Sequence, residues 1–229
     1  MIWAIVENEK IEAKPSTQGI CPICKGKLFS KCGDVNVWHW SHFKDENCDT
    51  WYEPETLWHK HWKMTFGKDN AEIRIEKDER FHIADILTNE NVVIELQNSP
   101  ILKPLIRERE DFYGERMIWL INGFHFKNNF KIREPKDKSY KGWLIDSIRL
   151  QNNNQRVFQW SYARKSWKEV QRNLFIDFGD EFLFWIKEGM GTSSGLGTLV
   201  IKEDFIIKYG GNFEYYSKNT GYDHRLNNK

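Results

Sequence analysis

All four cysteines of this 229-residue chain lie within its first 48 residues, together with two histidines. The pair Cys21-Pro22-Ile23-Cys24 places two thiolates where both can bind one metal ion, because the two residues between them turn tightly. Cysteines grouped with histidines in a reducing compartment indicate a metal site rather than disulfides. We therefore expect a small zinc-binding module over residues 1–50. Its four filled ligand positions would make the ion a folding device and not a catalyst.

Four downstream residues compete for the two remaining zinc positions: Cys32, His39, His42 and Cys48. We favour His42 and Cys48, because they are the last such pair before a predicted helix and would tie that helix to Cys21 and Cys24. His39 lies between two tryptophans in a strand-like run, and Cys32 fits a buried thiol. A metal-free module with packed cysteines is the alternative.

The composition is that of an ordinary globular protein, with 40% hydrophobic and 15% aromatic residues. This is enough for one core with a small appended module. No apolar run approaches the ~20 residues that cross a bilayer, and the first ten residues lack the features of a signal peptide. We expect a cytoplasmic protein with no membrane partner.

Periodicity predicts a compact α/β core directly after the zinc module. A helix is expected from Trp51 to about Phe66, with Pro54 in its first turn. A second helix is expected to begin at Ser99-Pro100 and run towards Tyr113, with Pro104 as an irregularity near its start. Alternating or β-branched runs predict strands: Ala71–Glu76, Arg80–Leu87, Val92–Gln97 and Met117–Ile121. The predicted order is helix, three strands, helix, strand.

The last hundred residues differ in character and form a basic, aromatic-rich α+β extension over residues 127–229. Short strands are expected at Phe182–Ile186 and Thr198–Ile201, a helix around Ala163–Leu174, and a loop at 152–154. Between Phe126 and Arg172, twelve Lys or Arg face four acids, so this segment carries +8 and the rest of the chain −7.

The basic segment is interleaved with aromatic residues, which suits phosphate contacts combined with base stacking. The residues favoured for nucleic-acid binding fall at helical spacing: Arg164, Lys165, Lys168 and Arg172. A solvated charged face over an aromatic core is an equally simple interpretation.

Carboxylates inside predicted strands indicate a second site. Asp85 alternates with Phe81, Ile83 and Leu87 and is therefore expected on an apolar face, where a carboxylate is costly without a compensating partner. Glu95 lies within an apolar strand and shares its face with Gln97. A hairpin connection of two or three residues would place Asp85 and Glu95 opposite each other or one register step apart.

Two carboxylates on neighbouring strands repel unless a cation lies between them, and hard oxygen ligands suit magnesium or manganese. Such an ion polarises a phosphodiester and lowers the pKa of attacking water. On the preceding helix, Glu55, His59 and Lys63 follow at four-residue steps and share one face. The alternatives are a solvated helix face and structural ion pairs with Arg107, Arg109 or Lys63.

These motifs resemble two related groups of proteins. Asp85 followed by Glu95-Leu96-Gln97 resembles the metal site of the PD-(D/E)XK nuclease superfamily, with glutamine in place of the usual lysine. The wider pattern is similar to the competence protein CoiA-like family over roughly residues 18–123. It comprises Cys21-Pro22-Ile23-Cys24, Trp38-His39-Trp40-Ser41-His42, Cys48-Asp49, Glu55-Thr56-Leu57-Trp58-His59, Trp62-Lys63, His82-Ile83-Ala84-Asp85-Ile86, Ile94–Ile101 and Arg109–Tyr113.

The resemblance implies a restriction-endonuclease-like αβββαβ core, here residues 51–126, and a role in processing DNA during competence or recombination. It implies that Asp85 and Glu95 bind the metal and that Glu55 completes the acidic pocket. Gln97 departs from the usual pattern, and Lys63, or His59 as general base, would supply the missing function.

We accordingly expect a metal-dependent DNA nuclease with structural zinc and catalytic magnesium or manganese. The alternative is a catalytically inactive, zinc-containing DNA-binding or scaffold protein, which needs only the basic and aromatic surface. The expected partner is DNA, with a second copy of the chain or recombination proteins as further partners.

Overall fold

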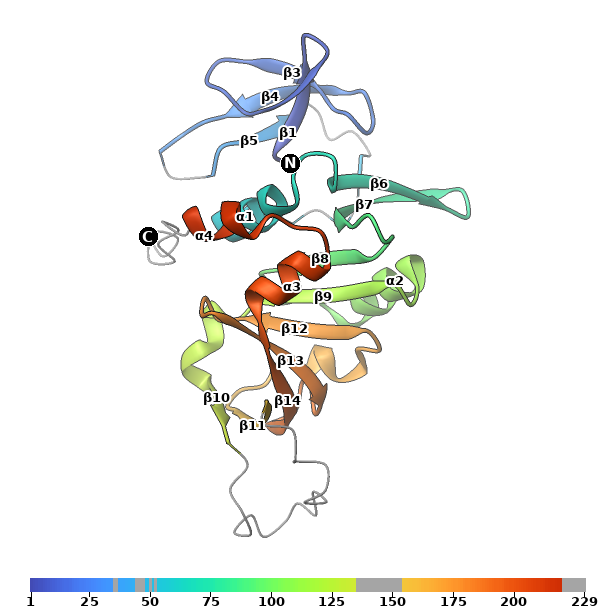
Figure 1. The fold of residues 1–229 in the computed structure, drawn as a ribbon. Helices are drawn as coiled ribbons and strands as arrows, with labels where there is room; N and C mark the ends of the chain where they lie inside the picture. The colour runs from blue at the N-terminus through green and yellow to red at the C-terminus, as the bar shows by residue number, and fades with distance from the viewer. Residues whose placement is uncertain (35–36, 44–47, 50, 52, 135–153, 220–229) are drawn as a thin grey trace. The chain divides into compact units, whose positions relative to one another are not determined.

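Strands make up most of the regular structure, and the few helices are short (Figure 1). The structure is a computed structural model and describes residues 1–34, 37–43, 48–49, 51, 53–134 and 154–219. The chain divides into two units, the first Met1–Ile94 with Tyr209–Lys229 and the second Glu95–Lys208. The boundary between them falls inside strand β8 (Val93–Gln97). In the described ranges, no helix has the length and apolar character that a bilayer span requires.

The first unit begins with a five-stranded antiparallel sheet in the order β2-β1-β3-β4-β5. Its strands are β1 (Trp3–Val6), β2 (Glu9–Glu12), β3 (Gln18–Ile20), β4 (Lys27–Lys31) and β5 (His39–His42). Glu7 and Asn8 join the first two strands with φ values of 51° and 69°. Positive φ at both central residues is typical of the tight hairpin turn that matches strand twist. The small core of this sheet contains Leu28 and Trp40.

The rest of the first unit consists of α1 (Leu57–Phe66), β6 (Ala71–Lys77), β7 (Arg80–Leu87), the start of β8 and α4 (Phe213–Lys218). β6 and β7 form an antiparallel hairpin, and β7 pairs with β8 through Ile86 opposite Ile94. Helix α1 buries Trp58 and Trp62, and the Tyr216 ring of α4 lies 5.1 Å from that of Trp62. This ring contact places residues 213–218 against α1.

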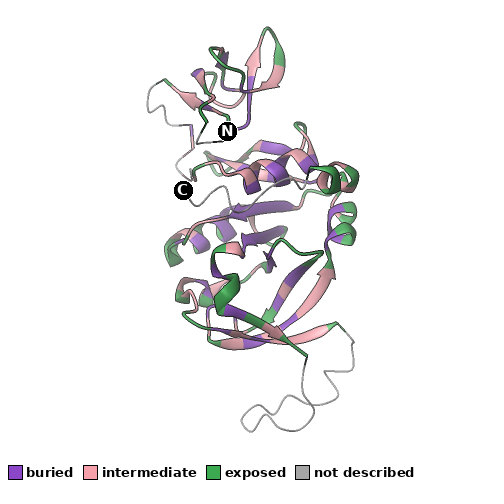
Figure 2. Cartoon of the chain, turned by 90° about the vertical axis from the view of Figure 1, so that its left-hand side faces the viewer, coloured by how far each residue is buried: buried purple, intermediate pink, exposed green. Residues whose placement is uncertain are grey.

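Six strands of the second unit follow one another in a sheet in the order β10-β11-β14-β13-β12-β9, and among these pairings of the described residues only β9 and β12 are parallel. The strands are β9 (Met117–Asn122), β10 (Phe130–Arg133), β11 (Gln155–Trp160), β12 (Asn173–Asp177), β13 (Phe182–Glu188) and β14 (Ser194–Ile201). The helices are α2 (Lys103–Tyr113), α3 (Lys202–Lys208) and the 3-10 turns η1 (Phe124–Asn129) and η2 (Lys165–Glu169). Buried residues concentrate on the strands (Figure 2).

The order α1, β6, β7, β8, α2, β9 along the chain is the predicted helix, three strands, helix, strand. Each predicted strand is present, with bounds that differ by a few residues. All five residues of β8 are buried, as its apolar character on both faces predicted. The α/β character is therefore confirmed. The division at residues 50 and 126 stays a prediction.

Both predicted helices of the core begin later than expected. Helix α1 starts at Leu57, because the Thr56 side chain accepts the N–H of His59 and caps it. Pro54 consequently lies in the extended segment before the helix. Helix α2 starts at Lys103, and Pro104 occupies its first turn, where proline fits because no backbone donor is needed. The expected cap at Ser99-Pro100 and the irregularity at Pro104 were wrong.

The helix expected over Ala163–Leu174 was also wrong, because a single 3-10 turn, η2, is followed by strand β12. Tertiary contacts prevent a longer helix from forming here. The Trp167 side chain is fully buried, and the buried Glu110 carboxylate accepts the backbone N–H groups of Gln171 and Arg172. These donors are therefore not available to a helix. The predicted loop at 152–154 lies outside the described residues except for Asn154.

A buried ion pair in the second unit generates a stability prediction. Lys202 Nζ lies 2.8 Å from Asp177 Oδ1, and the two side chains are only 4% and 2% exposed. Lys202→Met should lower the free energy of unfolding by about 3–5 kcal/mol, because it leaves a buried carboxylate without its cation. Lys127→Met removes a surface pair with Asp180 and should cost about 0–1 kcal/mol. Equal losses in chemical denaturation would contradict this assignment.

Candidate metal centre and acidic cluster

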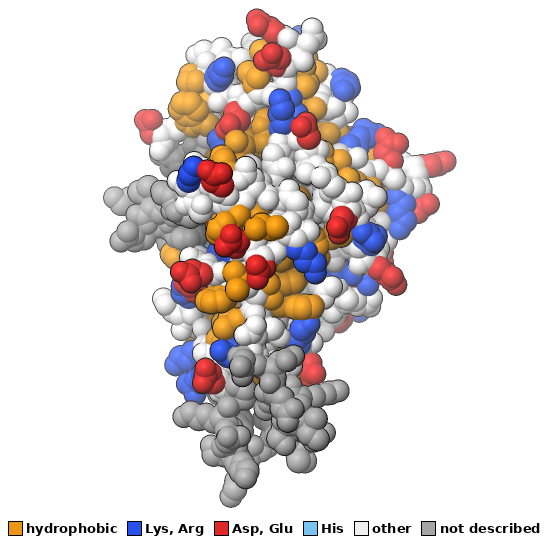
Figure 3. Space-filling view, in the orientation of Figure 1, with side chains coloured by type: hydrophobic (Ala, Val, Ile, Leu, Met, Phe, Trp, Pro, Cys, Tyr) orange, Lys and Arg blue, Asp and Glu red, His pale blue; other side chains and the backbone are white. Residues whose placement is uncertain are grey.

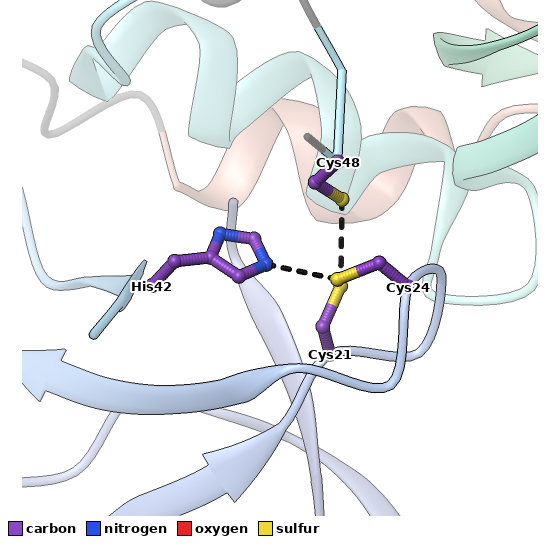
Figure 4. A group of neighbouring side chains, drawn as sticks. All are labelled: Cys21, Cys24, His42 and Cys48. Atoms are coloured by element: carbon purple, nitrogen blue, oxygen red, sulfur yellow. Dashed lines mark hydrogen bonds between the residues drawn. The ribbon is translucent and has the colours of Figure 1, made fainter. Parts of the chain in front are cut away.

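Four side chains of the first unit converge on one point: Cys21, Cys24, His42 and Cys48 (Figure 4). Their ligand atoms all lie within 4.8 Å of one another. Cys21 and Cys24 come from the turn between β3 and β4, and His42 ends β5. The turn directs both sulfurs inwards, because the N–H groups of Ile23 and Gly26 donate to Cys21 Sγ and Cys24 Sγ.

The geometry of these four atoms fits a tetrahedral zinc ion. Cys21 Sγ and Cys48 Sγ are 3.7 Å apart, and Cys24 Sγ and His42 Nε2 are 3.2 Å apart. Zinc–sulfur bonds of ~2.3 Å give a sulfur–sulfur edge of ~3.8 Å in a tetrahedron. Three sulfurs and one imidazole nitrogen are a common structural zinc set. The predicted cluster is confirmed, and it can hold a zinc ion.

The other two candidates do not belong to this cluster. Cys32 is half-buried and packs against the core of the small sheet. His39 Nδ1 lies 2.7 Å from the carbonyl of Val37. Within the cluster, a hydrogen bond joins the Cys21 and Cys48 sulfurs. It lowers the pKa of Cys21 to about 4 and raises the pKa of Cys48. Only one of these thiols is readily ionised without a metal.

Residues directly after Cys48 connect the metal cluster to strand β7. Asp49 Oδ2 accepts the backbone N–H of Ile83 at 2.7 Å, and Asp49 Oδ1 lies 2.9 Å from His82 Nδ1. The Trp51 ring stacks on the His82 ring with an interplanar angle of 2°. A ligand of the metal cluster is thus one residue away from a contact to the strand that carries Asp85.

The second site is a set of carboxylates around one buried lysine. Lys63 Nζ lies 3.1 Å from Glu55, 3.3 Å from Glu72 and 3.1 Å from Asp85. Lys63 comes from α1, Glu72 from β6, Asp85 from β7, and Glu55 from the segment before α1. We call these four residues the acidic cluster. The predicted proximity of Glu55, Lys63 and Asp85 is present, although Glu55 precedes the helix.

Glu72 was not predicted, and the pairing of β6 with β7 explains its presence. The register places Ala71 opposite Ile86 and Ile73 opposite Ala84, so Glu72 falls opposite Asp85. Like charges on opposed residues destabilise a sheet unless a cation intervenes, and Lys63 supplies it. Glu72 also accepts the N–H of Ile2 at 2.8 Å. Its φ of 54° is unfavourable for a non-glycine residue.

The exposure of Asp85 differs from expectation. Along β7 the fully buried side chains are His82, Ala84 and Ile86, and the face of Asp85 is only partly buried. The Asp85 side chain is 21% exposed, whereas Glu55 and Glu72 are 5% and 3% exposed. Asp85 shares its face with Phe81, Ile83 and Leu87 as predicted, but this face is only partly buried, because the opposite face of the strand carries the core. Asp85 is the most solvent-accessible carboxylate of the acidic cluster.

Charges within the cluster change its titration. Burial alone would raise the pKa of Glu55, but the Lys63 ammonium lowers it to about 2. Burial lowers the pKa of Lys63, and the three carboxylates raise it well above its usual value. The Glu55 carboxylate therefore contributes stability above its ordinary pKa of 4.5 that is lost as the pH falls towards 2.

His59 lies beside the cluster but is held by other partners. Its Nδ1 is 2.8 Å from Thr56 Oγ1, and its Nε2 is 3.6 Å from Glu53. Burial lowers the pKa of His59, but Glu53, Glu55 and Asp85 together raise it. These contacts favour the protonated form of the imidazole.

Glu95 and Gln97 lie in the second unit, on the other part of β8. Both are buried. Arg109 of α2 donates to Glu95 Oε2 at 3.0 Å, and Gln97 Nε2 donates to the carbonyl of Ser99. Asp85 and Glu95 thus each have a basic partner within their own unit. The joint metal site of these two carboxylates stays a prediction.

Arg164, Lys165, Lys168 and Arg172 were expected on one face of a helix. They do not share one, because η2 spans only Lys165–Glu169. The Arg164 guanidinium lies over the Phe126 ring, 4.9 Å from its centre. Lys168 and Arg172 line a cavity, and Lys165 is exposed outside it. Four other basic residues of the segment, at 136, 138, 141 and 149, are outside the described ranges. On the face drawn in Figure 3, basic and acidic side chains are interspersed.

Comparison with known proteins identifies the small sheet. Residues 4–50 match the family model described as competence protein CoiA, N-terminal domain. Among the curated proteins and the solved structures, nothing matches the chain. The matched residues contain four of the five strands completely and all four residues of the metal cluster. The match supports the CoiA-like resemblance and suggests a competence-related role.

The metal cluster generates the second prediction. Cys24→Ala should release zinc and unfold the small sheet, because its core is too small to fold without the metal. Elemental analysis should give one zinc per parent chain and less in the variant, and circular dichroism should report the loss of structure. Cys32→Ala, outside the cluster, should keep its zinc. Parent protein purified without chelator and found free of zinc would contradict the assignment.

The acidic cluster generates the third prediction. Lys63→Met should lower the free energy of unfolding by about 3–5 kcal/mol, because three carboxylates lose their shared cation. Lys60→Met is the matched control on the same helix. Lys60 pairs with Glu12 at 25% and 40% side-chain exposure, so its loss should cost about 0–1 kcal/mol. Chemical denaturation that finds no difference between the two variants would rule out this role for Lys63.

Proposed function

We propose that this chain is a metal-dependent deoxyribonuclease with a competence-related role. The acidic cluster is the observation that carries the proposal. Three carboxylates face two cations, the Lys63 ammonium and the Met1 N-terminal ammonium 3.7 Å from Glu55, so the group retains net negative charge although Glu55 and Glu72 are almost fully buried. Buried negative charge is costly and is relieved by a cation. The unfavourable backbone of Glu72 is of the kind that persists at functional sites.

Asp85 and Glu95 are the proposed ligands of magnesium or manganese. Asp85 is the accessible member of the acidic cluster, and the paired residues Ile86 and Ile94 are the direct chain neighbours of Asp85 and Glu95. Carboxylate oxygens are the hard ligands that these ions prefer. A bound divalent ion would polarise the phosphodiester and lower the pKa of the attacking water.

The remaining residues of the proposed site have distinct roles. Lys63 supplies the positive charge that Gln97 cannot supply, and its raised pKa keeps it protonated, so it stabilises the negative charge that develops on the phosphate. Glu55 and Glu72 hold the Lys63 ammonium near Asp85. His59 suits a positioning role better than general-base catalysis, because its ring nitrogens lie beside Thr56 Oγ1 and Glu53. Gln97 is left to orient substrate or water.

One observation favours a second candidate, a DNA-binding or scaffold protein without activity. Asp85 pairs with Lys63, and Glu95 pairs with Arg109. In these ion pairs a basic side chain balances the charge of each carboxylate, so both carboxylates can have a purely structural role without a metal. The two candidates differ in what the carboxylates do, so substitutions at Asp85 and Glu95 separate them.

The fourth prediction concerns DNA cleavage. The parent should cut plasmid or single-stranded DNA with magnesium or manganese and not without added metal. Asp85→Asn and Glu95→Gln should each lower the rate by roughly 100-fold or more, since each removes a charge needed in the transition state. Glu76→Gln, an exposed carboxylate on β6, should cut like the parent.

Thermal unfolding with and without manganese completes the test. Manganese should stabilise the parent and leave Asp85→Asn unchanged, because ligands that bind only the native state raise its stability. A parent with no cleavage and no manganese shift, together with destabilised Asp85→Asn and Glu95→Gln variants, would replace the nuclease with the binding or scaffold protein.

A further inference from the structure

The second unit contains a cavity of about 740 Å³. Its walls come from the end of η2 and the segment after it, from β12 and β13, and from the turn between β13 and β14. This volume lies within the range of about 300–1,000 Å³ that is usual for ligand sites. The cavity contains none of the residues proposed for catalysis, so it is a separate feature of the chain.

Two glycines of the β13–β14 turn shape one wall. Gly191 has φ +72°, and a Cβ there would lie 2.7 Å from the backbone nitrogen of Lys168. Gly189 has φ +82°, and a Cβ there would lie 2.4 Å from the carbonyl oxygen of Ser194. Thr192 Oγ1 lies 2.6 Å from the carbonyls of both Gly189 and Ser194. The β13–β14 turn is therefore packed against η2, and this packing positions Lys168, which lines the cavity.

Three basic side chains line the cavity: Lys168, Arg172 and Lys187. The Arg172 Nε donates to the carbonyl of Gly114 at 2.7 Å, which orients the guanidinium. Neither lysine forms an ion pair with a carboxylate of the described residues, although Glu115 and Glu188 also line the cavity. Partial burial lowers the pKa of Lys187, and a bound anion would offset this cost. Lys168 and Arg172 are thus available to phosphate groups, and Lys187 reaches one when it leaves the Trp185 ring.

An aromatic surface lies in the same cavity. The half-buried Trp185 stacks on Phe175, with ring centres 5.3 Å apart and an interplanar angle of 19°. Phe175 therefore covers one face of the indole, and the Lys187 ammonium lies 2.7 Å from the ring centre, so a base stacks on this ring only when the flexible Lys187 side chain moves off it. Cations that follow a backbone, combined with an aromatic ring for a base, are characteristic of sites for single-stranded nucleic acid.

We infer that this cavity binds single-stranded DNA, with phosphates on Lys168, Arg172 and Lys187 and a base stacked on Trp185. A duplex does not fit this description, because its bases are paired and stacked on each other and cannot reach the indole. The choice of DNA as the nucleic acid rests on the proposed function. The cavity, its cations and its aromatic ring do not depend on it.

The test is fluorescence anisotropy with a labelled single strand of about 12 nucleotides, within the usual range of site sizes. Titrations are run without added magnesium or manganese, so that binding is measured apart from cleavage. The parent should bind this strand more tightly than a duplex or an RNA of the same sequence. The double variant Lys168→Ala/Lys187→Ala should bind about tenfold or more weakly. Its salt dependence should flatten by about 1.4 units, at ~0.7 per lost phosphate contact.

Two further variants test the aromatic ring and the specificity of the charge effect. Trp185→Ala should weaken binding by about 5- to 100-fold, and Trp185→Phe by much less, because a ring remains for stacking. Lys131→Ala/Arg133→Ala removes the same charge from exposed positions on β10, outside the cavity, and should bind like the parent. Thermal unfolding verifies that each variant is folded.

The results separate this inference from the nuclease proposal. If the protein binds as predicted but shows no metal-dependent cleavage, the nuclease proposal is rejected and the cavity remains the proposed binding site. Cleavage with equal weakening by the cavity and β10 double variants would overturn the cavity as the binding site. Equal affinity for single strand and duplex, or for DNA and RNA, would also overturn it. Loss of binding in Trp185→Phe equal to that in Trp185→Ala would exclude base stacking.

Discussion

The ammonium group of Lys63 is the interaction on which the first unit depends. It lies within 3.3 Å of carboxylates from three other parts of the chain: Glu55 before α1, Glu72 on β6 and Asp85 on β7. Charged groups are costly to bury singly, and a shared counter-ion is what makes their burial tolerable. The small sheet depends on the same group, because Glu72 accepts backbone N–H groups from Ile2 and Trp3. One cation therefore organises helix, hairpin and N-terminal strand together.

A hydrogen bond from β7 to Asp49 connects the metal cluster to the acidic cluster. Cys48 contributes to the metal cluster, and the next residue, Asp49, bonds to Ile83 of β7, two residues from Asp85. Zinc at the cluster would fix the position of Cys48 and, through Asp49, support the strand that carries the accessible carboxylate. The small sheet is thus more than an independent appendage. Residues 4–50, which match the CoiA N-terminal domain model, include all four residues of the metal cluster.

The metal ligands and the order of the core elements could be predicted from the sequence. Ligand choice follows from local spacing, since Cys21 and Cys24 share one turn and His42 and Cys48 are the last candidates before the helix. Strand order follows from hydrophobic periodicity, which is a local property. Helix starts were less certain, because the capping Thr56 and the first-turn Pro104 compete with nearby residues that look equally suitable.

By itself, the sequence determined the Cys/His cluster, the succession of helices and strands, and the presence of carboxylates in strands. Tertiary structure alone decided which carboxylates meet. Glu72 looks like an ordinary acid of an alternating strand, and only the register of β6 against β7 sets it opposite Asp85. Similarly, the buried Glu110 carboxylate accepts the backbone N–H groups of Gln171 and Arg172, so η2 and β12 form where a helix was expected over Ala163–Leu174. The first outcome depends on the register of a hairpin and the second on a contact between residues 61 positions apart, and periodicity within a single element reports neither.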